Sequence, residues 1–120
     1  MANVFKSAML DVTTTGLTIL ITVPTANPGA SPPVPPTTAV VKSILVCNDS
    51  ANTTLLDIEV LRSSATFEIF KEKSLATKTT TELLEQPLVL QESDVMKVQA
   101  NAANQVHITA SYLEITKGQL

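Results

Sequence analysis

The chain contains few of the residues that carry out chemistry in proteins. Its 120 residues include one histidine, one cysteine, one tyrosine, three glycines and no tryptophan. A single histidine excludes a His-paired metal site, and three glycines are too few for a glycine-rich phosphate loop. His107 alternates with two apolar residues onto the more polar side of its segment, and Cys47 ends an apolar segment as a small hydrophobic residue. The sequence therefore predicts no enzyme, no catalytic residue, no cofactor and no metal site.

Charge and aromatic content exclude further classes. The 8 basic and 11 acidic residues give a net charge of −3, and the lysines and arginines form no cluster. Because phosphate neutralisation supplies most non-specific nucleic-acid affinity, we expect no nucleic-acid partner. Aromatic residues make up 3% of the chain, which removes the stacking surfaces that single-stranded nucleic acids and sugar rings need.

The apolar residues form short segments. The apolar stretch at residues 17–23 is interrupted by threonines and is far too short to span a bilayer, and we expect neither a secretory leader nor a membrane partner. A lone cysteine is consistent with folding in a reducing cytoplasm. Hydrophobic residues nevertheless make up 44% of the chain and charged residues only 16%, so we expect some apolar surface to be buried against another protein.

Alternation of apolar and polar residues indicates an all-β protein. Leu17, Ile19, Ile21 and Val23 are predicted to share one face of a strand, and residues 56–60 and 67–69 to form a hairpin. The nearly continuous apolar run at residues 39–47 fits a strand that is buried on both faces or lies between subunits. With residues 88–90, 95–98 and 106–115, this pattern predicts a single-domain β-sandwich of about eight strands, of jelly-roll or immunoglobulin-like type.

Three segments leave more room for interpretation. Residues 1–15 are predicted to be an N-terminal arm or edge strand, and residues 16–120 the sandwich domain. A helix over residues 71–84 is the competing interpretation of that stretch, although its threonine run argues against it. Six of the seven prolines fall in or beside residues 25–38, which we expect to form a protruding loop without sheet pairing, either functional or disordered.

Two groups of polar and acidic residues are candidates for an acid-base pair and for a cation site. Asp57 and Glu59 lie two residues apart on one strand face, which is more typical of a solvated surface than of an acid-base pair. Glu92, Ser93 and Asp94, with Asn48 or Asp49, supply oxygen ligands at a spacing that falls short of a calcium loop.

The candidate functional residues are contact residues. Leu113 and Ile115 bring apolar side chains onto the polar face of the last strand, where they either cap the edge of the core or contact another subunit. Prolines reduce the freedom that a loop loses on binding, so the proline-rich loop is expected to contact a neighbouring protein together with the N-terminal arm. The predicted interface comprises Phe5, Met9, Pro32, Pro33, Val34, Pro35, Pro36, Leu113 and Ile115.

Three stretches resemble small virion proteins of tailed bacteriophages, of the type found in phages of aquatic bacteria. Residues 40–48 read V-V-K-S-I-L-V-C-N, similar to the V-K-S-I-x-L-x-N strand of that group, and a turn and L-D-I-E-V follow. Residues 83–100 are similar to its L-E-L-L-D-x-P-L-x-L-E-x-G-D-x-L-K-V segment, and residues 110–115, A-S-Y-L-E-I, to its V-S-Y-L-E-I end. Two departures stand out, Ser93 in place of a glycine and a longer proline loop.

The resemblance implies a β-sandwich component of the virion that folds in the bacterial host cytoplasm. The function expected from it is decoration or cementing of the capsid through many weak contacts. The expected partners are the major capsid protein or other virion proteins, and copies of the chain itself, with a trimer preferred because capsids present local three-fold positions. The alternatives are a neck, tail or fibre component, or a module that binds a host glycan.

Overall fold

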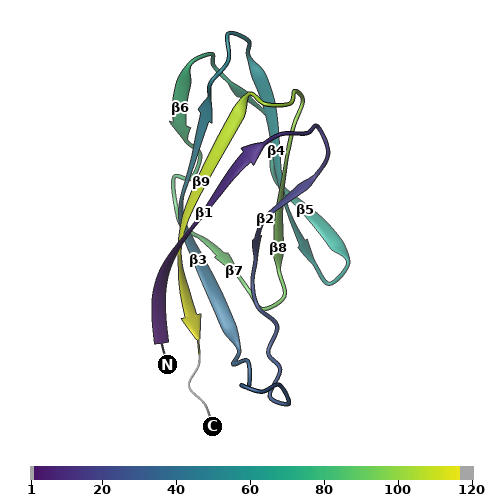
Figure 1. The fold of residues 1–120 in the computed structure, drawn as a ribbon, viewed down its shortest axis with the longest axis vertical. Helices are drawn as coiled ribbons and strands as arrows, with labels where there is room; N and C mark the ends of the chain where they lie inside the picture. Colours follow the sequence, from purple (N-terminus) through teal and green to yellow (C-terminus); the bar gives the residue numbers. More distant parts are fainter. Residues whose placement is uncertain (1, 117–120) are drawn as a thin grey trace.

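The structure is a computed structural model that describes residues 2–116, and it consists of nine β-strands joined by turns and loops (Figure 1). The strands are β1 (Ala2–Val12), β2 (Thr18–Thr22), β3 (Thr37–Asn48), β4 (Thr54–Arg62), β5 (Ala65–Leu75), β6 (Thr79–Glu82), β7 (Leu88–Leu90), β8 (Val95–Ala100) and β9 (Val106–Thr116). The last four residues of the predicted domain, 117–120, lie outside the described part. No helix within residues 2–116 is long and apolar enough to cross a membrane.

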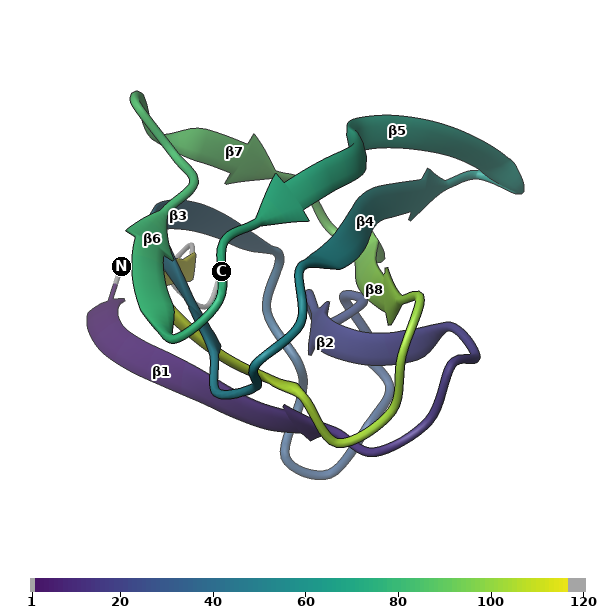
Figure 2. The ribbon, with the colours of Figure 1, turned by 90° about the horizontal axis from the view of Figure 1, so that it is seen from above.

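The strands form two antiparallel sheets that face each other (Figure 2). Sheet A has the order β1-β9-β3-β6, with β7 also paired to β3, and sheet B has the order β2-β8-β4-β5. β6 and β7 pair with different parts of β3, so they count as one interrupted strand. The interruption contains Pro87, which has no N–H to donate to a ladder.

The pairing is that of a jelly roll. With β6 and β7 taken together, the first strand pairs with the last, the second with the second last, and so on to the β4–β5 hairpin. This is the result of rolling one long hairpin into two sheets. The all-β sandwich prediction is confirmed, and of its two alternatives the jelly roll is correct. The immunoglobulin-like alternative is wrong, because β1 and β2 lie in different sheets.

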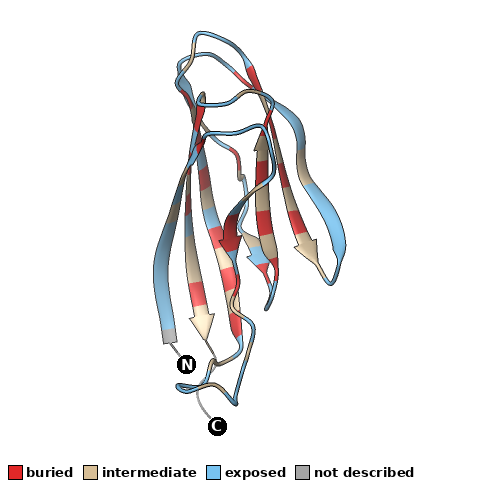
Figure 3. Cartoon of the chain, turned by 45° about the vertical axis from the view of Figure 1, so that its right-hand side comes forward, coloured by how far each residue is buried: buried red, intermediate tan, exposed pale blue. Residues whose placement is uncertain are grey.

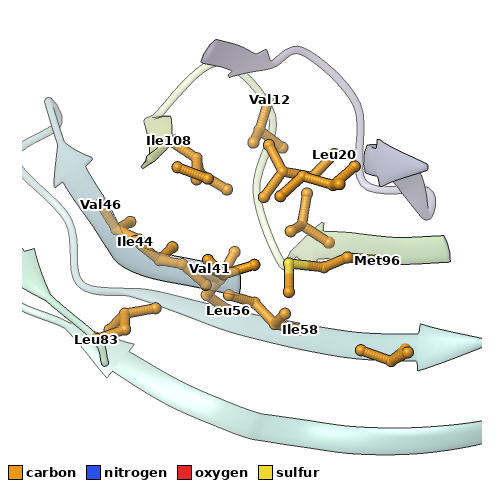
Figure 4. Packing of buried hydrophobic residues seen from close by; sticks show 14 of the residues in the cluster. Val12, Leu20, Val41, Ile44, Val46, Leu56, Ile58, Leu83, Met96 and Ile108 are labelled. Atoms are coloured by element: carbon orange, nitrogen blue, oxygen red, sulfur yellow. The ribbon is translucent and has the colours of Figure 1, made fainter. Parts of the chain in front are cut away.

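The core fills the space between the sheets. Figure 4 shows Val41 and Ile44 of sheet A beside Leu56 and Ile58 of sheet B, and all of these side chains are fully buried. On β4 and β8 buried and half-buried residues alternate strictly, as expected for strands with one face on the core. On β3, too, buried residues alternate with half-buried or exposed ones over most of its length, and Lys42 and Leu45 are exposed. The expectation that this strand is buried on both faces is therefore wrong for the single chain.

β2 differs from its prediction. The register between β2 and β8 shifts between Ile19 and Ile21, which is a β-bulge. As a result Leu20 and Ile21 are both buried, whereas Leu17 and Ile19 are 49% and 56% exposed. Strict alternation across residues 17–23 therefore placed Leu17 and Ile19 on the wrong face, because one extra residue in a strand reverses the side chains that follow it.

The three segments that allowed more than one interpretation are strands or loop in the structure. Residues 71–84 contain the end of β5 and all of β6, so the helix alternative is wrong. The proline-rich loop is shorter than predicted, because Thr37 and Thr38 already pair with β9 as the start of β3. Ala2–Val12 is an edge strand of sheet A, paired to β9 along its whole length.

Candidate interaction surface

The outer face of sheet A carries an apolar row that crosses four strands. Phe5 of β1 lies opposite Leu113 of β9, Leu113 lies opposite Val40 of β3, and Val40 lies opposite Val89 of β7. Directly opposed side chains on one face of a sheet are in contact distance, and neighbouring strands are about 4.8 Å apart, so the row extends over roughly 14 Å. We call these four residues the apolar row.

The apolar row is accessible to a partner. Phe5 is 77% exposed and Val89 is 52% exposed, while Val40 and Leu113 are half-buried by their neighbours in the sheet. Met9, 78% exposed, lies on the same outer face of β1. Single exposed apolar residues are ordinary, but a contiguous apolar surface is typical of an interaction site.

The sequence predicted half of this row. It singled out Phe5, Met9, Leu113 and Ile115, and the structure brings all four to the outer face of sheet A. Ile115 lies opposite Thr38, one step beyond the row, and is half-buried. Val40 and Val89 were missed, because only strand pairing places them beside Leu113. The signal available for Val40 was its position in the apolar run that suggested a strand between subunits.

The proline-rich loop lies at one end of the sandwich (Figure 1). Asn27 and Val34 exchange two backbone hydrogen bonds, of 2.8 and 2.9 Å, so the loop closes on itself through an isolated bridge that belongs to neither sheet. It is tied to the turn before β8 by Ala26 N, which donates to Glu92 Oε2 at 2.7 Å. In that turn Ser93 replaces the glycine of the resembling family and adopts a φ of 71°.

The proline-rich loop lies at one end of the sandwich (Figure 1), whereas the apolar row lies on the outer face of sheet A. Of the predicted contact residues in the loop, Pro32, Pro33 and Pro36 are exposed. Val34 and Pro35 are half-buried. The loop lies at the same end of the sandwich as the start of β1 and the end of β9 (Figure 1). The structure thus places the predicted contact residues of the loop at one end of the sandwich, and those of β1 and β9 on the outer face of sheet A (Figure 1).

The charged side chains near β1 are paired within the chain. Lys6 Nζ lies 2.9 Å from Oε1 of the buried Glu114, and His107 Nε2 lies 3.3 Å from Asp11 Oδ1. The hydrogen bond to Glu114 raises the pKa of Lys6 above its usual value, although partial burial opposes this. Lys6 therefore stays protonated at neutral pH and its charge is directed toward Glu114.

The acidic residues considered as a cation site do not converge. Asp94 lies in the turn before β8, where it accepts hydrogen bonds from Arg62 Nε at 2.8 Å, Arg62 Nη2 at 2.5 Å and Gln91 N at 2.7 Å. The Arg62 guanidinium lowers the pKa of Asp94 below its usual value, and burial opposes this. Asn48 lies at the opposite end of the sandwich and bonds its own turn and the carbonyl of Leu75. No group of three metal-ligating side chains occurs in the described part of the chain.

Two further carboxylates, those of Asp57 and Glu82, also have structural partners. Asp57 Oδ1 accepts a hydrogen bond from Glu72 N at 2.6 Å and Oδ2 lies 3.5 Å from Lys71 Nζ. Glu82 accepts hydrogen bonds from Ser43 Oγ, Ile44 N and Leu84 N, beside the break between β6 and β7. Burial acts to raise the pKa of Glu82, but these hydrogen bonds outweigh it and lower the pKa.

Comparison with known proteins supports the fold. No protein-family model and no curated protein match the sequence. A viral particle contains the same fold. One structural match is to a chain of the T13 IBDV viral particle, with a TM-score of 0.55 and 11% sequence identity. The match covers 93% of this chain and 30% of that chain, so this protein corresponds to less than a third of the viral chain. At this identity the comparison shows a common architecture, a jelly roll of a kind used in an icosahedral virus particle.

Proposed function

We propose that the protein is a non-enzymatic structural component of a bacteriophage virion. Support comes from the jelly-roll topology, which is shared over 93% of the chain with part of a viral particle protein. The resemblance of residues 40–48, 83–100 and 110–115 to tailed-phage virion proteins supports the same conclusion. The apolar row adds a surface suited to protein contact.

The specific role that we propose is decoration or cementing of the capsid. A cement protein needs a rigid scaffold and contact surfaces, because weak contacts repeated over many copies add up through avidity. The sandwich supplies the scaffold, and the outer face of sheet A and the proline-rich loop supply two contact surfaces. The proposed partners are the major capsid protein and further copies of the chain, with local three-fold positions on the capsid favouring a trimer there.

The observation that carries the proposal is the apolar row on a jelly-roll sheet. Removing an exposed apolar row from water is favourable, and on the outer face of a sheet this requires another protein to cover the row. A neck, tail or fibre position is the alternative within the virion. Glycan binding is the alternative to a role in virion assembly. It would need exposed aromatic side chains, and in the described part of the chain these are limited to Phe5 and Phe67.

The decisive experiment is quantitative mass spectrometry of purified virions. We expect the chain in a copy number similar to that of the major capsid protein, and cryo-electron microscopy should place it on the outside of the head. A handful of copies per particle would move it to the neck or tail. Absence from purified virions would refute the virion role altogether, and specific binding on a glycan array would then favour the glycan-binding alternative.

A further inference from the structure

The free edge of β1 differs from the other sheet edges in the described part of the chain. An edge strand exposes unpaired backbone N–H and C=O groups, and proteins usually protect such edges with short strands, bulges, prolines or charges. β1 is 11 residues long and pairs with β9 without a single register shift. It contains no proline, and Figure 3 shows it exposed along most of its length.

Each of the other edges is protected. β2 has five residues and a bulge, and β6 and β7 have four and three residues. β5 is long but has two register shifts against β4 and carries four charged residues, Glu68, Lys71, Glu72 and Lys73. Only β1 combines length and regularity with two large, exposed apolar side chains, Phe5 and Met9, on its outer face, and these are properties of an edge that pairs with another strand.

The sequence of β1 is complementary to itself in one antiparallel register. When two copies of Ala2–Val12 overlap completely, Phe5 lies opposite Met9 of the second copy and Val4 lies opposite Leu10. Ser7 then lies opposite itself on the two-fold axis. The two most exposed apolar side chains of the strand, at 77% and 78%, would therefore cover each other twice in every pair.

Charge selects the same register. Lys6 lies opposite Ala8 and Asp11 opposite Asn3, so no two like charges meet. Shifting the strands by two residues in one direction places Lys6 opposite itself, and shifting them in the other direction places Phe5 opposite Asp11. Since Lys6 is paired with Glu114 and Asp11 lies beside His107, neither charge of the strand is left without a partner in its own chain.

We propose that the partner of the β1 edge is a second copy of this chain, bound through antiparallel β1–β1 pairing around a two-fold axis at Ser7. The pairing joins two five-stranded sheets into one continuous sheet. It extends the apolar row of one copy onto Met9 of the other, so the pair presents a wider apolar outer face than either chain alone. The proposal concerns the isolated chain and does not depend on the virion role.

The first test measures association in solution. Light scattering with size-exclusion chromatography, over a micromolar concentration series, should give a mass twice that of the 12.8 kDa chain. Phe5→Lys removes both apolar contacts and should raise the dimer dissociation constant about tenfold or more. Phe67→Lys is the matched control, because Phe67 is 55% exposed on β5 and should leave the mass unchanged. Circular dichroism checks that each variant is folded.

Two further variants test the register. In the double variant Phe5→Lys with Met9→Glu, each new lysine faces a new glutamate of the other copy, and dimerisation should recover relative to Phe5→Lys alone. Ser7→Cys in a Cys47→Ser background should form an intermolecular disulfide on mild oxidation, because the two Ser7 positions meet at the axis. Asn3→Cys in the same background, on the same face of β1, should not.

Several outcomes overturn the proposal. A wild-type chain that stays monomeric, together with no cross-link at Ser7→Cys, would show that β1 does not pair with itself and would leave a strand of another protein as its partner. A trimer would show that the edge meets a different surface of the second copy. A dimer that Phe5→Lys leaves intact would place the contact elsewhere on the molecule.

Discussion

Two adjacent leucines on β4 provide a direct test of the fold. Leu56 is 0% exposed and points between the sheets, whereas Leu55 is half-buried on the outer face of sheet B. The backbone N–H and C=O of Leu55 bond Asn101, so truncating either side chain leaves these bonds in place. Substituting each leucine by alanine therefore compares the same chemical change on the two faces of one strand.

The expected costs differ severalfold. Leu56→Ala loses the transfer free energy of a fully buried side chain and leaves a cavity, which together amount to about 3 kcal/mol of unfolding free energy. Leu55→Ala leaves no closed cavity and should cost about 1 kcal/mol. The lower strand propensity of alanine affects both variants alike. For a domain of this size the Leu56→Ala change corresponds to a melting temperature lowered by about 12 °C.

The assay is urea denaturation followed by far-ultraviolet circular dichroism, since the chain has no tryptophan for fluorescence. All proteins are compared at one concentration, because association would shift apparent stability. Equal costs for the two substitutions, or a larger cost for Leu55→Ala, would refute the assignment of the faces of β4. A one-residue change of register would produce that reversal.

Three further predictions concern the acid range and the contact surfaces. The Arg62 guanidinium lowers the pKa of Asp94, so the stability that Asp94 contributes is present above its usual pKa of 3.8 and is lost as the pH falls through the lower folded-state value. The stability advantage of the wild type over Asp94→Asn, measured in urea, should therefore be full at pH 7 and shrink below pH 3.8. Leu113→Lys should reduce occupancy on virions, measured by mass spectrometry, while changing the free energy of unfolding by less than about 1 kcal/mol. Replacing residues 32–36 by a two-residue turn should leave the isolated chain folded, because no core strand is altered, and should lower its occupancy on virions.

Controls separate these effects from general damage. Glu85→Gln is the control for the loss of one negative charge, because Glu85 is exposed and takes part in none of the ion pairs of the described residues. It should show no comparable pH-dependent difference. Ile19→Lys is the control for Leu113→Lys: it changes an apolar residue on sheet B that is 56% exposed, and therefore more accessible than Leu113, and should leave virion occupancy unchanged. Unchanged occupancy of the loop-shortened protein would show that the proline-rich loop contacts nothing on the virion. A wild-type advantage over Asp94→Asn that does not shrink as the pH falls below 3.8 would contradict the role assigned to the Asp94 charge.

Local sequence patterns predicted some residues of the candidate interaction surface and missed others. Phe5 and Met9 in β1, and Leu113 and Ile115 in β9, were recognisable as apolar residues in otherwise polar surroundings. Val40 and Val89 were not, because each is unremarkable within its own strand. They belong to the apolar row only through pairing between strands that are 49 residues apart in the sequence, counted from residue 40 to residue 89.

The sequence by itself determined the class of the fold and the core face of most strands. Alternation along β4 and β8 is a local property, since side chains of a strand point to opposite faces whatever the strand pairs with. The absence of helix-forming segments and the paucity of chemical groups are likewise properties of composition.

Only the tertiary structure decided how the strands pair, and that pairing makes the jelly roll. The bulge that exposes Leu17 and Ile19, the exposed edge of β1 and the alignment of Phe5, Leu113, Val40 and Val89 all depend on hydrogen bonds between distant segments. Such contacts form because of the geometry of the whole sheet and leave no periodic signal in the neighbouring residues. The surface that this protein offers to a partner is therefore a product of topology built on strands that the sequence specifies locally.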